Sequence, residues 1–156
     1  MDSSWFRQEA EKLSPTLYRI AVSMLRSSHD AQDAVQEALL KCWAARDRCR
    51  KETFGPYLTR ILINECRNVQ RYRMRQTPVE TLPDTAAPQE DIDIDLQNAL
   101  EQLPDALRLP LLLKYMEGWN DAMIAKALGT TALAVRGRLH RGRKALRNTL
   151  ERGNTP

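Results

Sequence analysis

Glycine, histidine and long hydrophobic runs are scarce in this chain of 156 residues, which holds six glycines and two histidines. None of the motifs GxxxxGKS/T, GxGxxG, HExxH or GxSxG occurs, so the common phosphate-binding and catalytic loops are missing from the sequence. His29 and His140 stand far apart along the chain and form no general-base constellation. We therefore predict a protein that is not an enzyme and that uses no cofactor.

Cysteine is scarce as well. Cys42, Cys49 and Cys66 are an odd number, and no CxxC pair occurs. A metal site would have only the two separate histidines as further nitrogen ligands. We expect three buried or half-buried free thiols in a reducing compartment, and no bound metal.

No membrane or export segment is evident. No uncharged apolar stretch approaches the roughly 18 residues that a spanning helix needs. Residues 1–7 lack the basic segment and the apolar run that begin a secretion signal. We expect a cytoplasmic protein with no membrane insertion of its own.

Charge is unevenly distributed along the chain. Residues 1–76 hold 14 Lys/Arg and 9 Asp/Glu, and residues 96–156 hold 10 and 5. Residues 77–95 hold six acidic residues, three prolines and no basic residue. Basic blocks are typical of proteins that bind nucleic acid. We predict two domains, 1–76 and 96–156, joined by an acidic flexible linker, 77–95.

Helical spacing of apolar residues dominates both basic blocks and predicts an all-α fold. Ser14 and Pro15 form a typical start pair for a helix, so the first helical stretch should divide there. The helices predicted from spacing and capping residues cover 4–27 in two pieces, 28–47, 55–76, 96–103, 105–116, 121–128 and 131–152.

The pattern in residues 121–150 is the most specific one. A short helix, a turn at Gly129 and a longer basic helix are typical of the DNA-binding helix-turn-helix. Val135 and Leu139 begin an apolar face of the last helix that Gly142, Leu146 and Leu150 continue.

A second face of this last helix is basic and should contact duplex DNA, with Arg136 as the best candidate for hydrogen bonds to a guanine. Ala132, Leu133 and Ala134 at its start would touch thymine methyl groups or permit close approach. The alternative is an ordinary solvated basic helix face. The predicted contacts to duplex DNA are Thr131, Ala132, Leu133, Arg136, Arg138, His140, Arg141 and Arg143.

The helix predicted over residues 56–76 carries a polar, mainly basic stripe opposite Leu58, Leu62 and Val69. Arginine beside aromatic side chains suits unstacked, single-stranded bases. Solvated arginine over core aromatics would give the same pattern. The candidate contacts to single-stranded DNA are Phe54, Tyr57, Arg60, Asn64, Arg67, Asn68 and Arg71.

The preceding helix is different because it carries an acidic pair. Asp33 and Glu37 are four residues apart, with Gln36 beside them, so two like charges share one helix face. This arrangement suggests a basic protein partner. Stabilisation of Asp33 by the helix dipole is the alternative.

Both halves together resemble the sigma-70 family of bacterial RNA polymerase sigma factors, in its extracytoplasmic-function (ECF) subgroup. The resemblance covers roughly residues 13–150. It is carried by the segments Asp33-Ala34-Val35-Gln36-Glu37, FGPYLTRILIN at 54–64, ALEQLP at 99–104 and VRGRLHRGRKALR at 135–147.

The resemblance implies a region-two helical bundle and a region-four helix-turn-helix domain. Asp33, Gln36 and Glu37 match the motif that docks on the clamp helices of the largest subunit of core RNA polymerase. The helix with Asn64 and Arg71 would hold the non-template strand of the −10 element. Region four would grip the β flap and bind the −35 element. An anti-sigma factor is also implied.

The alternative function is a stand-alone helix-turn-helix regulator that binds duplex DNA without polymerase. It would account for the C-terminal half. It does not account for the acidic segment or for the second basic block with its aromatic residues.

Overall fold

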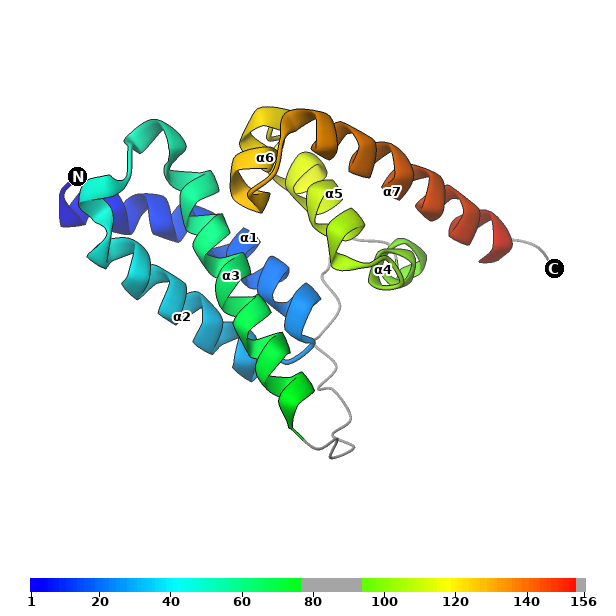
Figure 1. Ribbon diagram of the computed structural model, residues 1–156, viewed down its shortest axis with the longest axis horizontal. Coiled ribbons are helices and arrows are strands. Elements are labelled where there is room, and N and C mark those ends of the chain that lie inside the picture. The colour runs from blue at the N-terminus through cyan, green and yellow to red at the C-terminus, as the bar shows by residue number, and fades with distance from the viewer. Residues whose placement is uncertain (77–93, 154–156) are drawn as a thin grey trace. The chain divides into compact units, whose positions relative to one another are not determined.

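The computed structural model describes residues 1–76 and 94–153, and all regular secondary structure in these ranges is helical (Figure 1). The prediction of an all-α fold is confirmed. The helices form two units, each described below by itself. Residues 77–93, which make up most of the predicted linker, lie outside the described residues, while Ile94 and Asp95 already belong to a helix.

The first unit consists of three long helices that pack pairwise against one another. Large apolar side chains of the first and third helices, such as Leu17, Ile20 and Leu62, are fully buried, whereas the second helix contributes mainly alanines. Small side chains on the second helix allow its neighbours to approach closely. The elements are α1 (Ser3–Leu25), α2 (Ser28–Ala44), the 3-10 turns η1 (Arg46–Arg48) and η2 (Lys51–Thr53), and α3 (Phe54–Arg75).

Local capping residues fix where these helices begin and end. Asp2 Oδ1 accepts the backbone N–H of Trp5 at 2.7 Å, and Ser27 Oγ accepts that of Asp30 at 3.2 Å. Arg26 takes the left-handed conformation, with φ of 53°, and its N–H donates to Val22 O. The junction of α1 and α2 is therefore encoded within a few residues.

The predicted division of the first helix at Pro15 is wrong, because α1 runs without a break through this residue. Proline inside a helix costs about 3 kcal/mol. Leu13 and Leu17 on either side of it are buried, each contributing about 1.5–3 kcal/mol. Burial along the whole of α1 therefore outweighs the local cost, and Pro15 itself is exposed.

Aromatic rings join the ends of all three helices. Phe54 lies edge-to-face with Trp5 at 5.1 Å between centroids and with Phe6 at 5.4 Å. Phe6 makes a similar contact with Trp43 at 5.1 Å. Such pairs add about 0.5–1.5 kcal/mol each beyond their buried area. The cluster fixes the start of α3 against the start of α1 and the end of α2.

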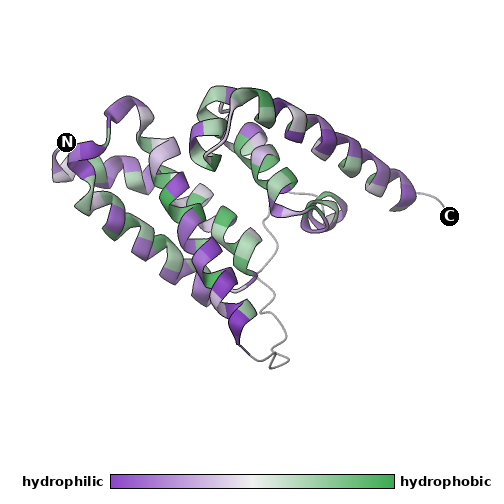
Figure 2. Cartoon of the chain, in the orientation of Figure 1, coloured by the Kyte–Doolittle hydropathy of each residue, from purple (hydrophilic) through white to green (hydrophobic). Residues whose placement is uncertain are grey.

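In the second unit, α5 and α4 both pack against α7. Leu109, Leu113, Val135 and Leu139 are buried, and Figure 2 shows α7 as hydrophilic over most of its length with hydrophobic turns between. The elements are α4 (Ile94–Glu101), α5 (Asp105–Glu117), α6 (Asp121–Leu128) and α7 (Ala132–Gly153).

The helix-turn-helix is built from α6 and α7, and its predicted bounds agree with the structure to within one residue. Asn120 Oδ1 accepts the N–H of Met123 at 2.9 Å at the start of α6. Gly129 ends α6 with φ of 69°, a conformation that favours glycine. Thr131 Oγ1 accepts the N–H of Ala134 at 3.1 Å and so caps α7. No helix in the described ranges 1–76 and 94–153 is long and apolar enough to cross a bilayer.

Candidate nucleic-acid interface

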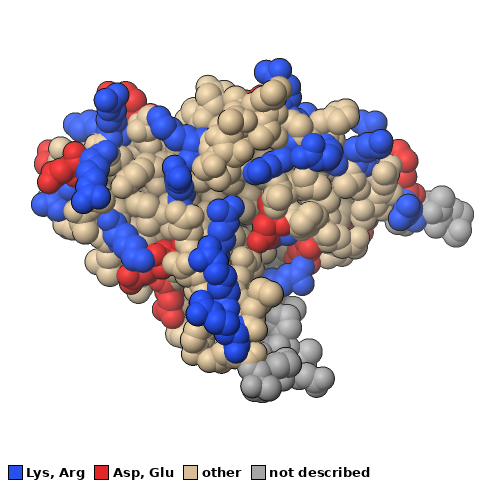
Figure 3. Space-filling model, in the orientation of Figure 1, with Lys and Arg blue, Asp and Glu red and all other residues tan. Residues whose placement is uncertain are grey.

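A band of basic side chains follows α3 from its middle to its C-terminal end (Figure 3). The structure brings the predicted polar residues together on one solvent-facing side of this helix, opposite the buried Leu58 and Leu62. Arg71 Nη1 donates to Asn68 Oδ1 at 3.2 Å, and the exposed guanidinium has further N–H groups that can act as donors. The exposed members are Arg60, Asn64, Arg67, Asn68 and Arg71.

The two aromatic residues of the predicted set are less exposed than these polar side chains. Phe54 is 3% exposed inside the aromatic cluster, so its ring supports α3 from below and is not available for stacking on a base. Tyr57 is half-buried. Tyr72, farther along α3, is 61% exposed, and its hydroxyl accepts a hydrogen bond from Gln76 Nε2 at 2.6 Å.

One arginine near this face has a structural role. Arg73 Nη1 donates to Leu25 O at 2.7 Å, and Arg73 also forms an ion pair with Asp30. The guanidinium thereby links α3 to the end of α1 and to the start of α2. Arg71 and Arg73 are two residues apart and have different partners because successive residues of a helix point about 100° apart.

The start of α7 presents the predicted contacts to duplex DNA. Thr131, Ala132 and Leu133 are exposed, Leu133 to 75%. Arg136 follows one turn later with its side chain 74% exposed. Farther along α7, the predicted contacts His140 and Arg141 are exposed, and Arg138 is half-buried.

The carboxylate of Asp121, which the sequence analysis did not single out, lies beside Arg136. Asp121, the first residue of α6, places Oδ1 3.3 Å from Lys114 Nζ of α5 and Oδ2 3.8 Å from Arg136 Nε of α7. Its side chain is 25% exposed. Asp121 and Arg136 are far apart in the sequence, and only the turn between α6 and α7 brings them together, so no local pattern could reveal the pair.

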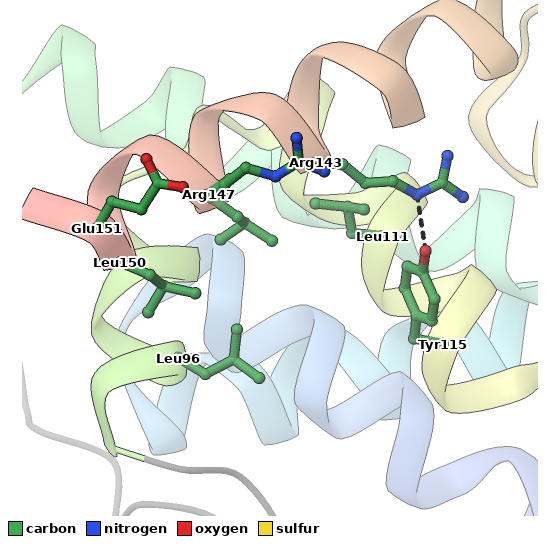
Figure 4. Close-up of a pocket in the computed structure, with 8 residues that line it drawn as sticks. Leu96, Leu111, Tyr115, Arg143, Arg147, Leu150 and Glu151 are labelled. Carbon is green, nitrogen blue, oxygen red and sulfur yellow. Dashed lines mark hydrogen bonds between the residues drawn. The ribbon is translucent and has the colours of Figure 1, made fainter.

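Arg143 differs from the other predicted contacts of α7. Its Nε donates to Tyr115 Oη at 2.7 Å, and its guanidinium lies 5.7 Å from the centre of that ring (Figure 4). The pair lies at the edge of a groove between α4, α5 and α7. This groove is lined by Leu96, Leu111, Tyr115, Arg143, Leu146, Arg147, Leu150 and Glu151.

The predicted docking residues Asp33, Gln36 and Glu37 all point into solvent from α2. His29 Nε2 lies 3.5 Å from Asp33 Oδ2. The hydrogen bond from Lys41 to Glu65 raises the pKa of Lys41, and the charges of Glu65 and Glu37 raise it further. Lys41 therefore carries its positive charge one turn from Glu37 and is paired with Glu65 of α3.

Beside the acidic pair lies an apolar groove between α1 and α2. Gln36 is one of its lining residues, and Leu40 is 65% exposed there. An exposed apolar surface next to charged residues is typical of a protein interaction site. The groove is lined by Ser3, Phe6, Arg7, Ala10, Glu11, Ser14, Gln36, Leu39, Leu40 and Trp43.

The cysteines form no chemical site in the part of the chain that the structure describes. Cys42 and Cys66 are buried, Cys49 is half-buried, and none of the three forms a disulfide. Burial raises the pKa of the Cys42 thiol to about 12, so it stays protonated at neutral pH. Within residues 1–76 and 94–153, no three His, Cys, Asp or Glu side chains come together in a way that could hold a metal ion.

Two family models match the two units of the chain. The model of sigma-70 region 2 matches residues 10–76, and that of sigma-70 region 4 matches residues 93–146. The first match contains α2 and α3 with their acidic and basic surfaces. The second contains the helix-turn-helix.

The curated proteins that resemble this chain are RNA polymerase sigma factors. The chain is 32% identical to the ECF RNA polymerase sigma factor SigE of Mycolicibacterium smegmatis, over 92% of this chain and 59% of SigE. It is 30% identical to the RNA polymerase sigma factor SigV of Bacillus subtilis, over 83% of this chain and 81% of SigV. The chain thus spans somewhat less than two thirds of the length of the mycobacterial relative.

Solved structures agree with this fold. The sigma factor RpoE of Bartonella quintana, solved in complex with the anti-sigma factor NepR, superposes with a TM-score of 0.78 at 27% identity, covering 94% of this chain and 96% of that one. CnrH, solved with the cytosolic domain of CnrY, gives a TM-score of 0.72 at 22% identity over 99% and 92% of the two chains, and supports the fold alone. With both region models matched in order, this chain belongs to the sigma-70 family of RNA polymerase sigma factors, in its ECF subgroup.

Proposed function

We propose that this chain associates with core RNA polymerase, directs it to specific promoters and has no catalytic activity of its own. The observation that carries the proposal is the presence of two separate exposed basic faces, on α3 and at the start of α7, in units that match sigma-70 regions 2 and 4. Two DNA-contacting faces on one chain suit the two separate promoter elements that sigma factors recognise.

In this proposal the α3 face holds the melted non-template strand of the −10 element. Arginine and asparagine donate hydrogen bonds to phosphates and to base edges. The residues proposed for these contacts are Tyr57, Arg60, Asn64, Arg67, Asn68 and Arg71, with Phe54 acting from beneath as part of the aromatic cluster.

The start of α7 reads the −35 duplex. The N-terminal turns of a recognition helix reach base edges, while basic residues farther along neutralise phosphates. We assign Thr131, Ala132, Leu133 and Arg136 to the first role. Arg138, His140 and Arg141 have the second role, and Arg143 contributes from the edge of the α4–α5–α7 groove.

Docking on core polymerase uses Asp33, Gln36 and Glu37, which would meet the clamp helices of the largest subunit. The apolar groove beside Gln36 supports this assignment. The charged pair would orient the partner, and the exposed apolar side chains would be buried when it binds. The C-terminal unit would grip the β flap. The division into domains 1–76 and 96–156 with a linker between them remains part of the proposal, except that α4 begins at Ile94, inside the predicted linker.

An anti-sigma factor is a further proposed partner. The sigma factor RpoE was solved in complex with the anti-sigma factor NepR. A partner of this class would compete with polymerase or DNA for the surfaces described above. We place the protein in the cytoplasm, where the polymerase is found.

A stand-alone regulator would bind its operator without polymerase, and this difference gives the test. Purified chain is added to core polymerase with genomic DNA, and the 5′ ends of the transcripts are sequenced. We expect a new, discrete set of start sites that share −35 and −10 sequences. Tight binding to duplex DNA by the chain alone, with no new start sites, would contradict the proposal.

A further inference from the structure

An acidic residue, Asp121, lies at the edge of the proposed DNA-binding face of α7. DNA is a dense polyanion, so a carboxylate near it weakens binding through repulsion. Asp121 is such a residue. It begins α6, keeps part of its side chain in solvent and lies beside Arg136, which points outward from α7.

The position of Asp121 is well determined by its surroundings. It is the first residue of α6, where the helix dipole stabilises a negative charge. Its Oδ1 faces Lys114 Nζ at 3.3 Å, so α5 and α6 both hold the carboxylate in place. Only Oδ2 is turned toward α7, and Arg136 Nε is 3.8 Å away from it.

Arg136 on its own would be poorly ordered. A long, largely exposed arginine side chain loses close to 2 kcal/mol of rotamer freedom when it is fixed on a base, and that loss reduces affinity. A fixed negative charge next to Nε favours rotamers in which this edge of the guanidinium faces Asp121. The N–H groups on the end of the guanidinium, one on each terminal nitrogen, then remain available to a base.

We infer that Asp121 is a positioning residue that orients Arg136 to read a guanine in the −35 duplex, and so sets specificity at that base pair. Two parallel N–H groups match the O6 and N7 acceptors that guanine presents in the major groove. Pre-orientation reduces the ordering cost for this geometry and not for contacts to phosphates. This inference depends on the proposed function, because it concerns a residue of the −35 interface.

The role differs from that of a purely structural ion pair. If Asp121 only stabilised α6 and held Lys114, its removal would weaken binding to every DNA sequence by the same factor. If it acted only as a negative charge, its removal would strengthen binding to every sequence. A positioning role changes the discrimination between guanine and an analogue that lacks one acceptor.

The test uses holoenzyme and a promoter identified by start-site sequencing. Each guanine of its −35 element is replaced in turn by 7-deazaguanine, which keeps base pairing and lacks the N7 acceptor. Binding is measured for the wild type, Asp121→Asn, Asp121→Glu, Arg136→Ala and the double variant Asp121→Asn/Arg136→Ala. Glu101→Gln removes one negative charge elsewhere in the same unit and is the matched control.

At one guanine we expect the wild type to lose about tenfold in affinity on N7 removal. Asp121→Asn should reduce this loss to about twofold, Arg136→Ala should do the same because alanine has no donor, and the double variant should show no further change. Asp121→Glu should restore most of the discrimination, and Glu101→Gln should leave it at the wild-type value.

An unchanged discrimination ratio in Asp121→Asn, whatever its absolute affinity, would overturn the inference. So would a wild type that is insensitive to N7 removal at every guanine while still starting transcription at the promoter, a result that leaves the proposed function intact. Failure of the wild-type holoenzyme to start there at all would instead contradict the proposed function, and the inference with it.

Discussion

Gly142 of α7 lies directly against Leu111 of α5, at a point where no side chain fits. A Cβ atom at position 142 would lie 2.9 Å from Leu111 Cδ1 and 3.3 Å from the carbonyl oxygen of Leu107. Gly142→Ala should therefore lower the free energy of unfolding by about 1–3 kcal/mol through overpacking, although alanine is the better helix former. Thermal or urea unfolding of the purified protein measures this change.

Gly137 on the same helix is the matched control. A Cβ there would meet only the far end of the Arg141 side chain, at 3.1 Å from its Nη1, and that side chain can move. Gly137→Ala should raise stability by roughly 0.5–1 kcal/mol from helix propensity. Equal effects of the two substitutions would contradict the close contact between α5 and α7.

Thr59 offers a substitution that should stabilise the first unit. Its side chain is fully buried in α3, and its hydroxyl has no hydrogen-bond partner among the residues that the structure describes. Thr59→Val keeps the shape of the side chain and removes the cost of an unsatisfied buried hydroxyl, so stability should rise by about 1 kcal/mol. Urea unfolding followed by circular dichroism is the measurement.

The control for this substitution is Thr16 on α1. Thr16 is also buried but does have an interaction partner. Thr16→Val should lower stability, because the partner then loses its contact. A loss of stability in Thr59→Val comparable with that in Thr16→Val would show that the hydroxyl of Thr59 is satisfied.

Much of the fold could be predicted because its signals are local. Asn120, Gly129 and Thr131 each act on backbone groups within a few residues, so the bounds of α6 and the start of α7 follow from the sequence alone. The exposed polar face of α3 was also predictable, because it follows from helical spacing.

Features that depend on distant segments could not be predicted in this way. The position of Phe54 before a basic stripe suggests base stacking, but two rings of α1 pack against it and it is buried. Pro15 remains helical because burial along α1 outweighs its local cost. The contact of Asp121 with Arg136 forms only after the turn between α6 and α7 closes.

Arg71 and Arg73 should separate DNA binding from stability. Arg71→Ala removes an exposed donor of the α3 face, so promoter opening by holoenzyme should fall several-fold while thermal stability changes little. Arg73→Ala removes the contacts to Leu25 O and Asp30, and stability should fall by about 1–2 kcal/mol. Permanganate footprinting measures opening, and thermal unfolding measures stability. The reverse pattern would place Arg73 on the DNA-binding face.

The thiols should differ in reactivity according to their burial. In folded protein near pH 8, Cys49 should react with a thiol reagent much faster than Cys42 and Cys66, which should react only after unfolding. Burial raises the pKa of Cys42 to about 12, so the native state holds this proton more tightly than the unfolded chain.

The Cys42 contribution to stability is consequently present in full below the unfolded pKa, near 8.5, and is lost as pH rises toward 12. Unfolding measured between pH 8 and pH 11 should show a decline that is smaller in Cys42→Ala than in the wild type. Identical slopes in the two proteins would show that Cys42 ionises equally well in both states.

Reversing the charge of the acidic pair on α2 should weaken docking strongly without unfolding the protein. Asp33 and Glu37 are exposed, and the contact of Asp33 with His29 is solvent-exposed, so neither carboxylate supports the core. Asp33→Lys/Glu37→Lys should reduce retention on immobilised core polymerase at least tenfold, because like charges would then face a basic partner. The fold is checked by circular dichroism.

The control is Asp47→Lys/Glu52→Lys, which makes the same change of net charge on exposed residues outside α2 and should leave retention unchanged. Equal losses in the two double variants would mean that overall charge, and not this pair, determines binding to the polymerase.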